Sequence, residues 1–112
     1  MSTGKPKYDL GEIQRQVEAG QFRISGRIHR FIINRYDGED PADVVREVVC
    51  CIEGKDFHKS DRLDVLPNTF ADIYKGVSCD EYPDEEWYVK FAVVDGETVV
   101  DVLSCNWDGY IH

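Results

Sequence analysis

Two β-rich runs decide the fold of this chain: Trp87-Tyr88-Val89-Lys90-Phe91-Ala92-Val93-Val94 and Glu97-Thr98-Val99-Val100-Asp101-Val102-Leu103-Ser104, separated by Asp95-Gly96. Asp-Gly is favoured in two-residue hairpin turns, because both turn positions need a positive φ. The pattern therefore predicts an antiparallel hairpin. Its register pairs Val94 with Glu97, Phe91 with Val100, Lys90 with Asp101, and Tyr88 with Leu103.

Strand alternation divides this hairpin into two faces. The first face is apolar and is expected to be core; it carries Trp87, Val89, Phe91, Val93, Val100 and Val102. The second face carries Tyr88, Lys90 and Asp101, a mixed polar set that a purely structural sheet does not require. Candidate functional residues are therefore expected on the second face.

Helical patterns come before the hairpin. Two or three helices are expected, because apolar residues recur at helical spacing over about 10–19, 27–36 and 41–53. Asp9 and Glu12 have the spacing of a capping box at the first of them. Asp40-Pro41 combines an N-cap with proline at the first helical position, which marks the start of the third.

Shorter strands complete the pattern. Residues 21–24 look extended, and Phe57–Asp61 and Thr69–Lys75 alternate with a period of two. Helices followed by an antiparallel sheet indicate an α+β domain whose helices pack on one sheet face. A length of 112 residues favours one domain over 1–112, with residues 1–8 and 106–112 as flexible or docked tails.

Charge is distributed unevenly along the chain. Residues 1–36 carry seven positive and three negative residues, a net +4, whereas the remaining 76 residues carry six and 19, a net −13. The total of −9 argues against a general nucleic-acid coat, because a polyanion is bound only where cations face it. A local basic face is compatible with this distribution, and so are cations on the solvated sides of helices.

The four cysteines show neither Cys-x-x-Cys nor Cys-to-His spacing, so we expect buried reduced thiols and no metal or cofactor. No apolar run has the length of a transmembrane helix, and the N-terminus does not resemble a signal peptide. We therefore expect a cytoplasmic protein without a membrane partner.

Several short stretches follow one another in a familiar order: Tyr8-Asp9-Leu10, Val17-Glu18-Ala19-Gly20-Gln21-Phe22-Arg23-Ile24, Asp56-Phe57-His58-Lys59-Ser60, Asp72-Ile73-Tyr74, Tyr88-Val89-Lys90-Phe91-Ala92-Val93-Val94-Asp95, and Ser104. Together they span nearly the whole chain. The set resembles the MqsR-type toxins of bacterial type II toxin–antitoxin systems, small mRNA interferases with a RelE-like fold. The resemblance implies a metal-independent endoribonuclease that cleaves mRNA and is neutralised by a cognate antitoxin protein.

Such a reaction deprotonates a ribose 2′-hydroxyl, stabilises an anionic phosphorane and protonates the leaving 5′-oxygen. The working residues of the family match Lys59 and Tyr88 here, whereas its glutamine position holds Ala71 and its last lysine position holds Asn106. Lys59 is thus expected to clamp a phosphate, or else to be a solvated strand lysine. Tyr88 is expected to donate a proton or to stack on a base, or else to be an ordinary strand aromatic.

His58 is a further catalytic candidate because imidazole side chains serve as general acids and bases, but strand alternation places it opposite Lys59 unless a bulge intervenes. Arg23, Arg62 and Lys90 are candidates for phosphate contact, with Asp101 as the expected partner of Lys90. Ala71, Asn106 and the acidic total leave a second interpretation open. In that interpretation the chain is a catalytically silent relative that binds a basic protein through its acidic surface.

Overall fold

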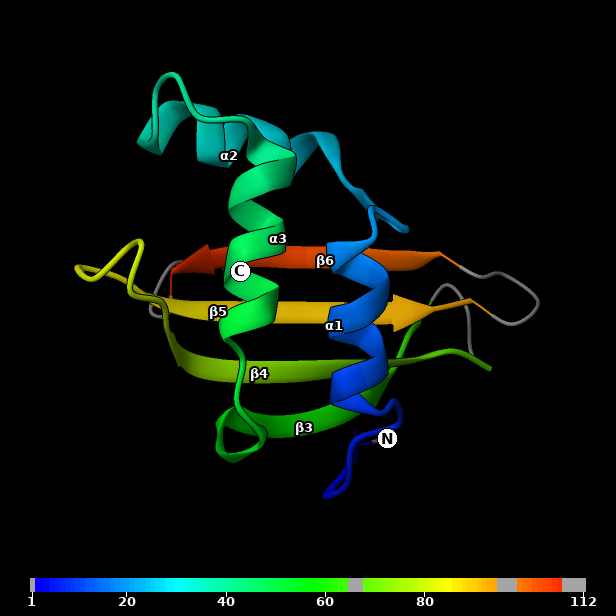
Figure 1. Ribbon diagram of the computed structural model, residues 1–112. Coiled ribbons are helices and arrows are strands. Elements are labelled where there is room, and N and C mark those ends of the chain that lie inside the picture. Colours follow the sequence, from blue (N-terminus) through cyan, green and yellow to red (C-terminus); the bar gives the residue numbers. More distant parts are fainter. Residues whose placement is uncertain (1, 65–67, 95–98, 108–112) are drawn as a thin grey trace.

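The computed structural model describes residues 2–64, 68–94 and 99–107 (Figure 1). Its helices are α1 (Leu10–Glu18), α2 (Gly26–Arg35), α3 (Pro41–Cys51) and the short 3₁₀ helix η1 (Gly54–Asp56). Its strands are β1 (Ser2–Thr3), β2 (Phe22–Ile24), β3 (Phe57–Arg62), β4 (Phe70–Ser78), β5 (Glu86–Val93) and β6 (Val100–Trp107). The predicted α+β fold class is confirmed, and the described residues form three α-helices where two or three were expected.

Each long helix begins at a capping side chain, and the sequence pattern indicated two of these caps. Asp9 accepts a hydrogen bond from the Glu12 N–H at 3.1 Å, and Asp40 accepts one from the Ala42 N–H at 2.9 Å. Such caps satisfy N–H groups that have no partner inside the helix. After α1, Gly20 has φ +85°, a conformation that favours glycine, and the chain turns there towards β2.

The strands form one six-stranded sheet in the order β1-β3-β4-β5-β6-β2. Neighbouring strands are antiparallel except for β2, which runs parallel to β6 and pairs Phe22 with Val100. The sequence did not reveal this parallel edge, because three residues carry too little pattern to show a partner. The fold is therefore a mixed sheet with an antiparallel centre.

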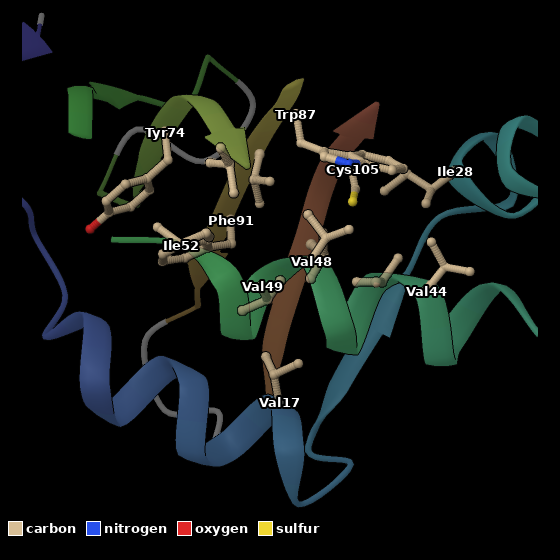
Figure 2. Packing of buried hydrophobic residues seen from close by; sticks show 14 of the residues in the cluster. Val17, Ile28, Val44, Val48, Val49, Ile52, Tyr74, Trp87, Phe91 and Cys105 are labelled. Carbon is tan, nitrogen blue, oxygen red and sulfur yellow. The ribbon is translucent and has the colours of Figure 1, made fainter. Parts of the chain in front are cut away.

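Helices α1 and α3 lie across one face of the sheet, and α2 lies beside the β6 edge (Figure 1). Apolar side chains from both layers meet between them, as Figure 2 shows for Val48, Phe91 and Trp87. The sheet contributes Tyr74, Val77, Trp87, Val89, Phe91, Val100, Val102 and Cys105 to this core. The predicted core face of the hairpin is therefore confirmed, with Val93 packing against it half-buried.

The predicted hairpin register is wrong. Val93 pairs with Val100, and Phe91 pairs with Val102 rather than with Val100. A bulge then follows, so that Lys90 pairs with Ser104 and Tyr88 with Asn106. The Asp95-Gly96 turn itself lies outside the described residues. Between the turn and the bulge, the observed pairing differs from the predicted pairing by two residues. Because side chains alternate with a period of two, this shift leaves the same side chains on the core face of the hairpin.

The predicted partnership of Lys90 with Asp101 is also wrong, for the same reason. Asp101 pairs with Ala92 in the sheet, and its carboxylate binds the Arg23 guanidinium of β2 instead. The two bonds measure 2.7 Å from Nε to Oδ1 and 2.8 Å from Nη2 to Oδ2. The parallel edge strand therefore supplies the cation that the hairpin was expected to supply.

The N-terminal segment is held against the sheet. β1 pairs with β3, and the buried Asp72 carboxylate accepts hydrogen bonds from the backbone N–H groups of Lys7 and Tyr8, each at 2.9 Å. The Tyr8 hydroxyl donates to the Phe70 carbonyl at 2.7 Å.

Among the described helices, none has both the length and the apolar character that crossing a membrane requires.

Candidate nucleic-acid interface

The side of the sheet away from α1 and α3 carries most of the predicted site; we name it the outer face (Figure 1). One row of directly paired residues crosses it through Lys59, Ile73, Lys90 and Ser104, from β3 to β6. The adjacent residues Tyr74, Phe91 and Cys105 point into the core. Because side chains alternate along a strand, the row points to the opposite side, away from α1 and α3.

Two neighbouring rows bring the remaining expected positions to the same face. Tyr88 lies opposite Asn106, two residues along β5 from Lys90. Ala71 lies between Asp61 and Ala92 in the row on the other side. The outer face therefore holds all four positions that the resemblance implies, two of them with the expected side chain and two without it.

Lys59 and Tyr88 do not lie close enough for direct contact through their backbones. Their strands are separated by one intervening strand, and Tyr88 is displaced by two residues from the row of Lys59. Strand spacing and rise place their Cα atoms about 12 Å apart. Two long side chains at this distance can contact different groups of one extended ligand.

The cations of the outer face differ in their partners. The Lys59 ammonium lies 3.1 Å from the Asp61 carboxylate, but its side chain remains 43% exposed. An ion pair exposed to this extent contributes about 0–1 kcal/mol, so a phosphate can compete for the lysine. Lys90 is half-buried and has no ion pair or side-chain hydrogen bond with any residue that the structure describes.

His58 occupies a β-bulge, as its predicted catalytic role required. Phe57 pairs with Tyr74 and Lys59 with Ile73, neighbours on β4, so His58 is the additional residue between them. Its side chain is exposed beside Lys59. The bulge thus removes the strict alternation that separated the two side chains in the sequence pattern.

The other two predicted phosphate contacts are placed differently from Lys90. Arg62 pairs with Phe70 on the helix side of the sheet, and its guanidinium lies over the Phe70 ring at 5.6 Å. Arg23 is on the outer face at the sheet edge, but Asp101 binds it there. The structure therefore brings together Lys59, Tyr88 and Lys90, adds Arg23 in an ion pair, and separates Arg62.

A cavity of about 540 Å³ lies beside the outer face, between α2 and the last residues of β6. Its lining includes Arg27, Arg30, Phe31, Asn106 and Trp107. The sequence pattern pointed to only one of these positions, Asn106. The sequence did contain a signal for the two arginines: they are three residues apart on one predicted helix, within the basic part of the chain.

The cysteines are not all buried, in contrast to the prediction. Cys79 and Cys105 are buried, Cys51 is half-buried and Cys50 is exposed, with its thiol 3.8 Å from a carboxylate oxygen of Glu18 on α1. Burial, followed by the hydrogen bond to Cys79, raises the pKa of the Cys51 thiol to about 12.

Two of the cysteines and one glutamate form a group whose sulfur and carboxylate oxygen atoms are of the kinds that bind metals. The ligand atoms of Glu47, Cys51 and Cys79 lie within 4.8 Å of one another. The two sulfur atoms, however, are 2.7 Å apart, whereas two thiolates on one tetrahedral zinc lie about 3.8 Å apart at a Zn–S bond of about 2.3 Å. As placed, the two thiols are too close to be separate ligands of one zinc ion.

Comparison with known proteins identifies no family for this chain. No protein-family model matches it, and no curated protein matches it.

Proposed function

We propose that this protein is a metal-independent endoribonuclease that cleaves mRNA, acting in the cytoplasm as the toxin of a toxin–antitoxin pair. The observation that supports this most strongly is the position of Lys59, Tyr88 and Lys90 on one sheet face, away from α1 and α3. Two cations and a phenol in adjacent rows offer charge stabilisation and proton transfer to one RNA backbone. A cognate antitoxin would neutralise the protein by covering this face.

The residues suggest a division of the reaction. The ribose 2′-oxygen attacks the adjacent phosphorus while the bond from phosphorus to the 5′-oxygen breaks. His58 accepts the proton of the 2′-hydroxyl, and the Tyr88 hydroxyl gives a proton to the leaving 5′-oxygen. Lys59 and Lys90 stabilise the negative charge that develops on the phosphorane. The products are a 2′,3′-cyclic phosphate and a 5′-hydroxyl end.

Cleavage of a labelled single-stranded RNA by the purified protein, in the presence of a metal chelator, tests this proposal. Lys59→Ala and Tyr88→Phe should each reduce the cleavage rate by about 100-fold or more. Arg15→Ala is the matched control: it removes one positive charge from α1, on the other side of the sheet, and should leave the rate unchanged. Lack of cleavage by the unaltered chain, or equal cleavage by the Lys59→Ala, Tyr88→Phe double variant, overturns the proposal.

A catalytically silent protein-binding module is the second candidate. It is favoured by the exposed acidic side chains of Asp80, Glu81, Asp84 and Glu86, which lie together between the end of β4 and the start of β5. Growth assays separate the two candidates. Induction of the unaltered chain should arrest cells if it cleaves mRNA, whereas a silent module leaves them growing like cells that carry the double variant.

A further inference from the structure

The cavity between α2 and β6 is contiguous with the outer face. Asn106 lines the cavity and is also the direct partner of Tyr88 across the two strands. An RNA chain that lies along Tyr88 therefore passes within one strand spacing of a residue that lines the cavity. The cavity volume of about 540 Å³ is in the range of pockets that hold small organic molecules.

Two arginines of the lining are available for an anion. Arg27 and Arg30 lie three residues apart on α2, both exposed, and neither has an ion pair or hydrogen bond with a residue that the structure describes. Arg35, in contrast, is held by Glu85, with its Nη2 2.6 Å from Oε1. A guanidinium offers parallel N–H donors that match a phosphate, so the Arg27 and Arg30 pair forms a phosphate-binding edge.

The apolar wall of the cavity is aromatic. The Phe31 and Trp107 rings have their centroids 4.2 Å apart at an interplanar angle of 43°. The Arg35 guanidinium lies 5.7 Å from the centroid of the Trp107 ring, which it helps to position. Rings of this kind are the platforms on which unpaired bases stack in proteins that bind single strands.

Asn106 is a polar residue in the lining of the same cavity. The residue is only 5% exposed, and its Oδ1 is buried without a hydrogen-bond partner among the described residues. A buried acceptor without a partner costs free energy, so a ligand that donates to it gains affinity. An amide also carries two donors, which lets one asparagine pair with both the donor and the acceptor of a base edge.

We infer that this cavity is a nucleotide subsite for single-stranded RNA, in which Arg27 and Arg30 hold a phosphate, the aromatic wall stacks on the base, and Asn106 reads the base edge. The inference rests on the proposed function and deepens it. It assigns base selection to the α2 edge and leaves bond cleavage to the outer face. Positively charged ligands, such as basic peptides, would be repelled by the two arginines.

Binding of 2′-O-methyl RNA hexanucleotides, measured by fluorescence anisotropy on the full chain, tests the subsite separately from cleavage, because these oligonucleotides lack the attacking hydroxyl. Arg27→Ala with Arg30→Ala should weaken binding by about tenfold or more. The slope of log affinity against log salt should become shallower by about 0.7 for each phosphate that the variant no longer binds. The matched control, Arg15→Ala with Lys55→Ala, removes the same charge from exposed surface ion pairs and should change affinity by less than about twofold.

Four homopolymeric hexanucleotides test the role of Asn106. The unaltered chain should bind one of the four about tenfold more tightly than the others, which is the discrimination that a bidentate amide contact provides. Asn106→Ala should abolish this preference. Equal affinity of the unaltered chain and the Arg27→Ala, Arg30→Ala variant, or equal weakening by the control pair, overturns the subsite. Normal binding without any RNA cleavage overturns only the proposed nuclease, and cleavage without arginine-dependent binding overturns only the subsite.

Discussion

Tyr88 and Asn106 lie directly opposite each other on β5 and β6, where the outer face meets the cavity beside α2. Tyr88 matches a tyrosine of the MqsR-type toxins that the sequence resembles, whereas Asn106 stands at a position where those toxins have a lysine. The Asn106 side chain is neutral and nearly buried, so it cannot replace the charge of that lysine. Lys90, half-buried in the neighbouring row, is the nearest described cation of β5 that can supply it.

Ala71→Gln, which introduces the glutamine that the MqsR-type toxins have at the matching position, is expected to destabilise the fold. Ala71 is fully buried between Asp61 and Ala92, so the larger side chain must displace its neighbours. Overpacking of this kind costs about 1–3 kcal/mol in the free energy of unfolding, which urea denaturation measures. Lys75→Gln on the same strand is exposed and should change stability by less than about 0.5 kcal/mol. Equal stability of the two variants would show that position 71 has room for a catalytic side chain.

Asp72→Ala is expected to release the N-terminal segment. The buried carboxylate accepts hydrogen bonds from the backbone N–H groups of Lys7 and Tyr8, and the variant leaves both donors without this acceptor. Hydrogen bonds to charged groups contribute about 1.5–3 kcal/mol each, so the unfolding free energy should fall by about 2–4 kcal/mol after partial relaxation of the segment. Urea denaturation measures this difference.

Hydrogen exchange gives a second readout for the same variant. The amides of Lys7 and Tyr8 should lose protection, whereas Asp43→Ala, which alters an acidic residue on α3, should leave them protected. Unchanged protection in Asp72→Ala would mean that other contacts fix the segment.

Stability is expected to fall at alkaline pH. Burial, followed by the nearby Asp72 carboxylate, raises the pKa of Tyr74 from 10.0 to about 12. Between these values the unfolded chain loses the phenolic proton while the folded chain keeps it, so the full stability present below pH 10 declines as pH rises towards 12. Tyr74→Phe should reduce the slope of unfolding free energy against pH by up to about 1.4 kcal/mol per unit. Parallel slopes for the two proteins in urea titrations would contradict this.

Cys51 and Cys79 are expected to form a disulfide when an oxidised small disulfide such as glutathione disulfide is added. Their sulfur atoms are 2.7 Å apart, and exchange transfers two electrons and two protons to the glutathione sulfurs as the protein bond forms. Closing this loop should raise the unfolding free energy by about 3–4 kcal/mol. Intact mass should fall by two hydrogens, and thermal unfolding should respond to reductant. Cys50→Ser should behave like the unaltered chain, and a mixed disulfide with glutathione as the end product would contradict the pairing.

Much of the fold could be predicted because its signals are local. Caps at Asp9 and Asp40 fixed the starts of two helices, and alternation in Trp87–Val93 fixed the core face of β5. The parallel pairing of β2 could not be predicted, because three residues do not specify a distant partner. The hairpin register failed because an internal bulge and the length of the connection override the preference of one dipeptide.

The candidate site was predictable only in part, for a similar reason. Lys59 and Tyr88 could be placed on one sheet face from the alternation of side chains along their strands, once a bulge at His58 is allowed. The ion pair of Arg23 with Asp101 depends on the parallel edge strand, and the cavity beside α2 depends on how a helix packs against a sheet edge. Such contacts between distant segments leave no periodic signal in the sequence.

Single-stranded RNA is proposed to bind across the outer face, and both the nuclease and the subsite depend on this. Backbone amide shifts of the labelled protein, titrated with a 2′-O-methyl RNA that cannot be cleaved, test it most directly. We predict the largest changes at Lys59, Tyr88, Lys90 and Asn106, with small changes on α1 and α3. Changes confined to the α1 and α3 surface or to the acidic residues 80–86, or no changes at all, would contradict RNA binding at this face.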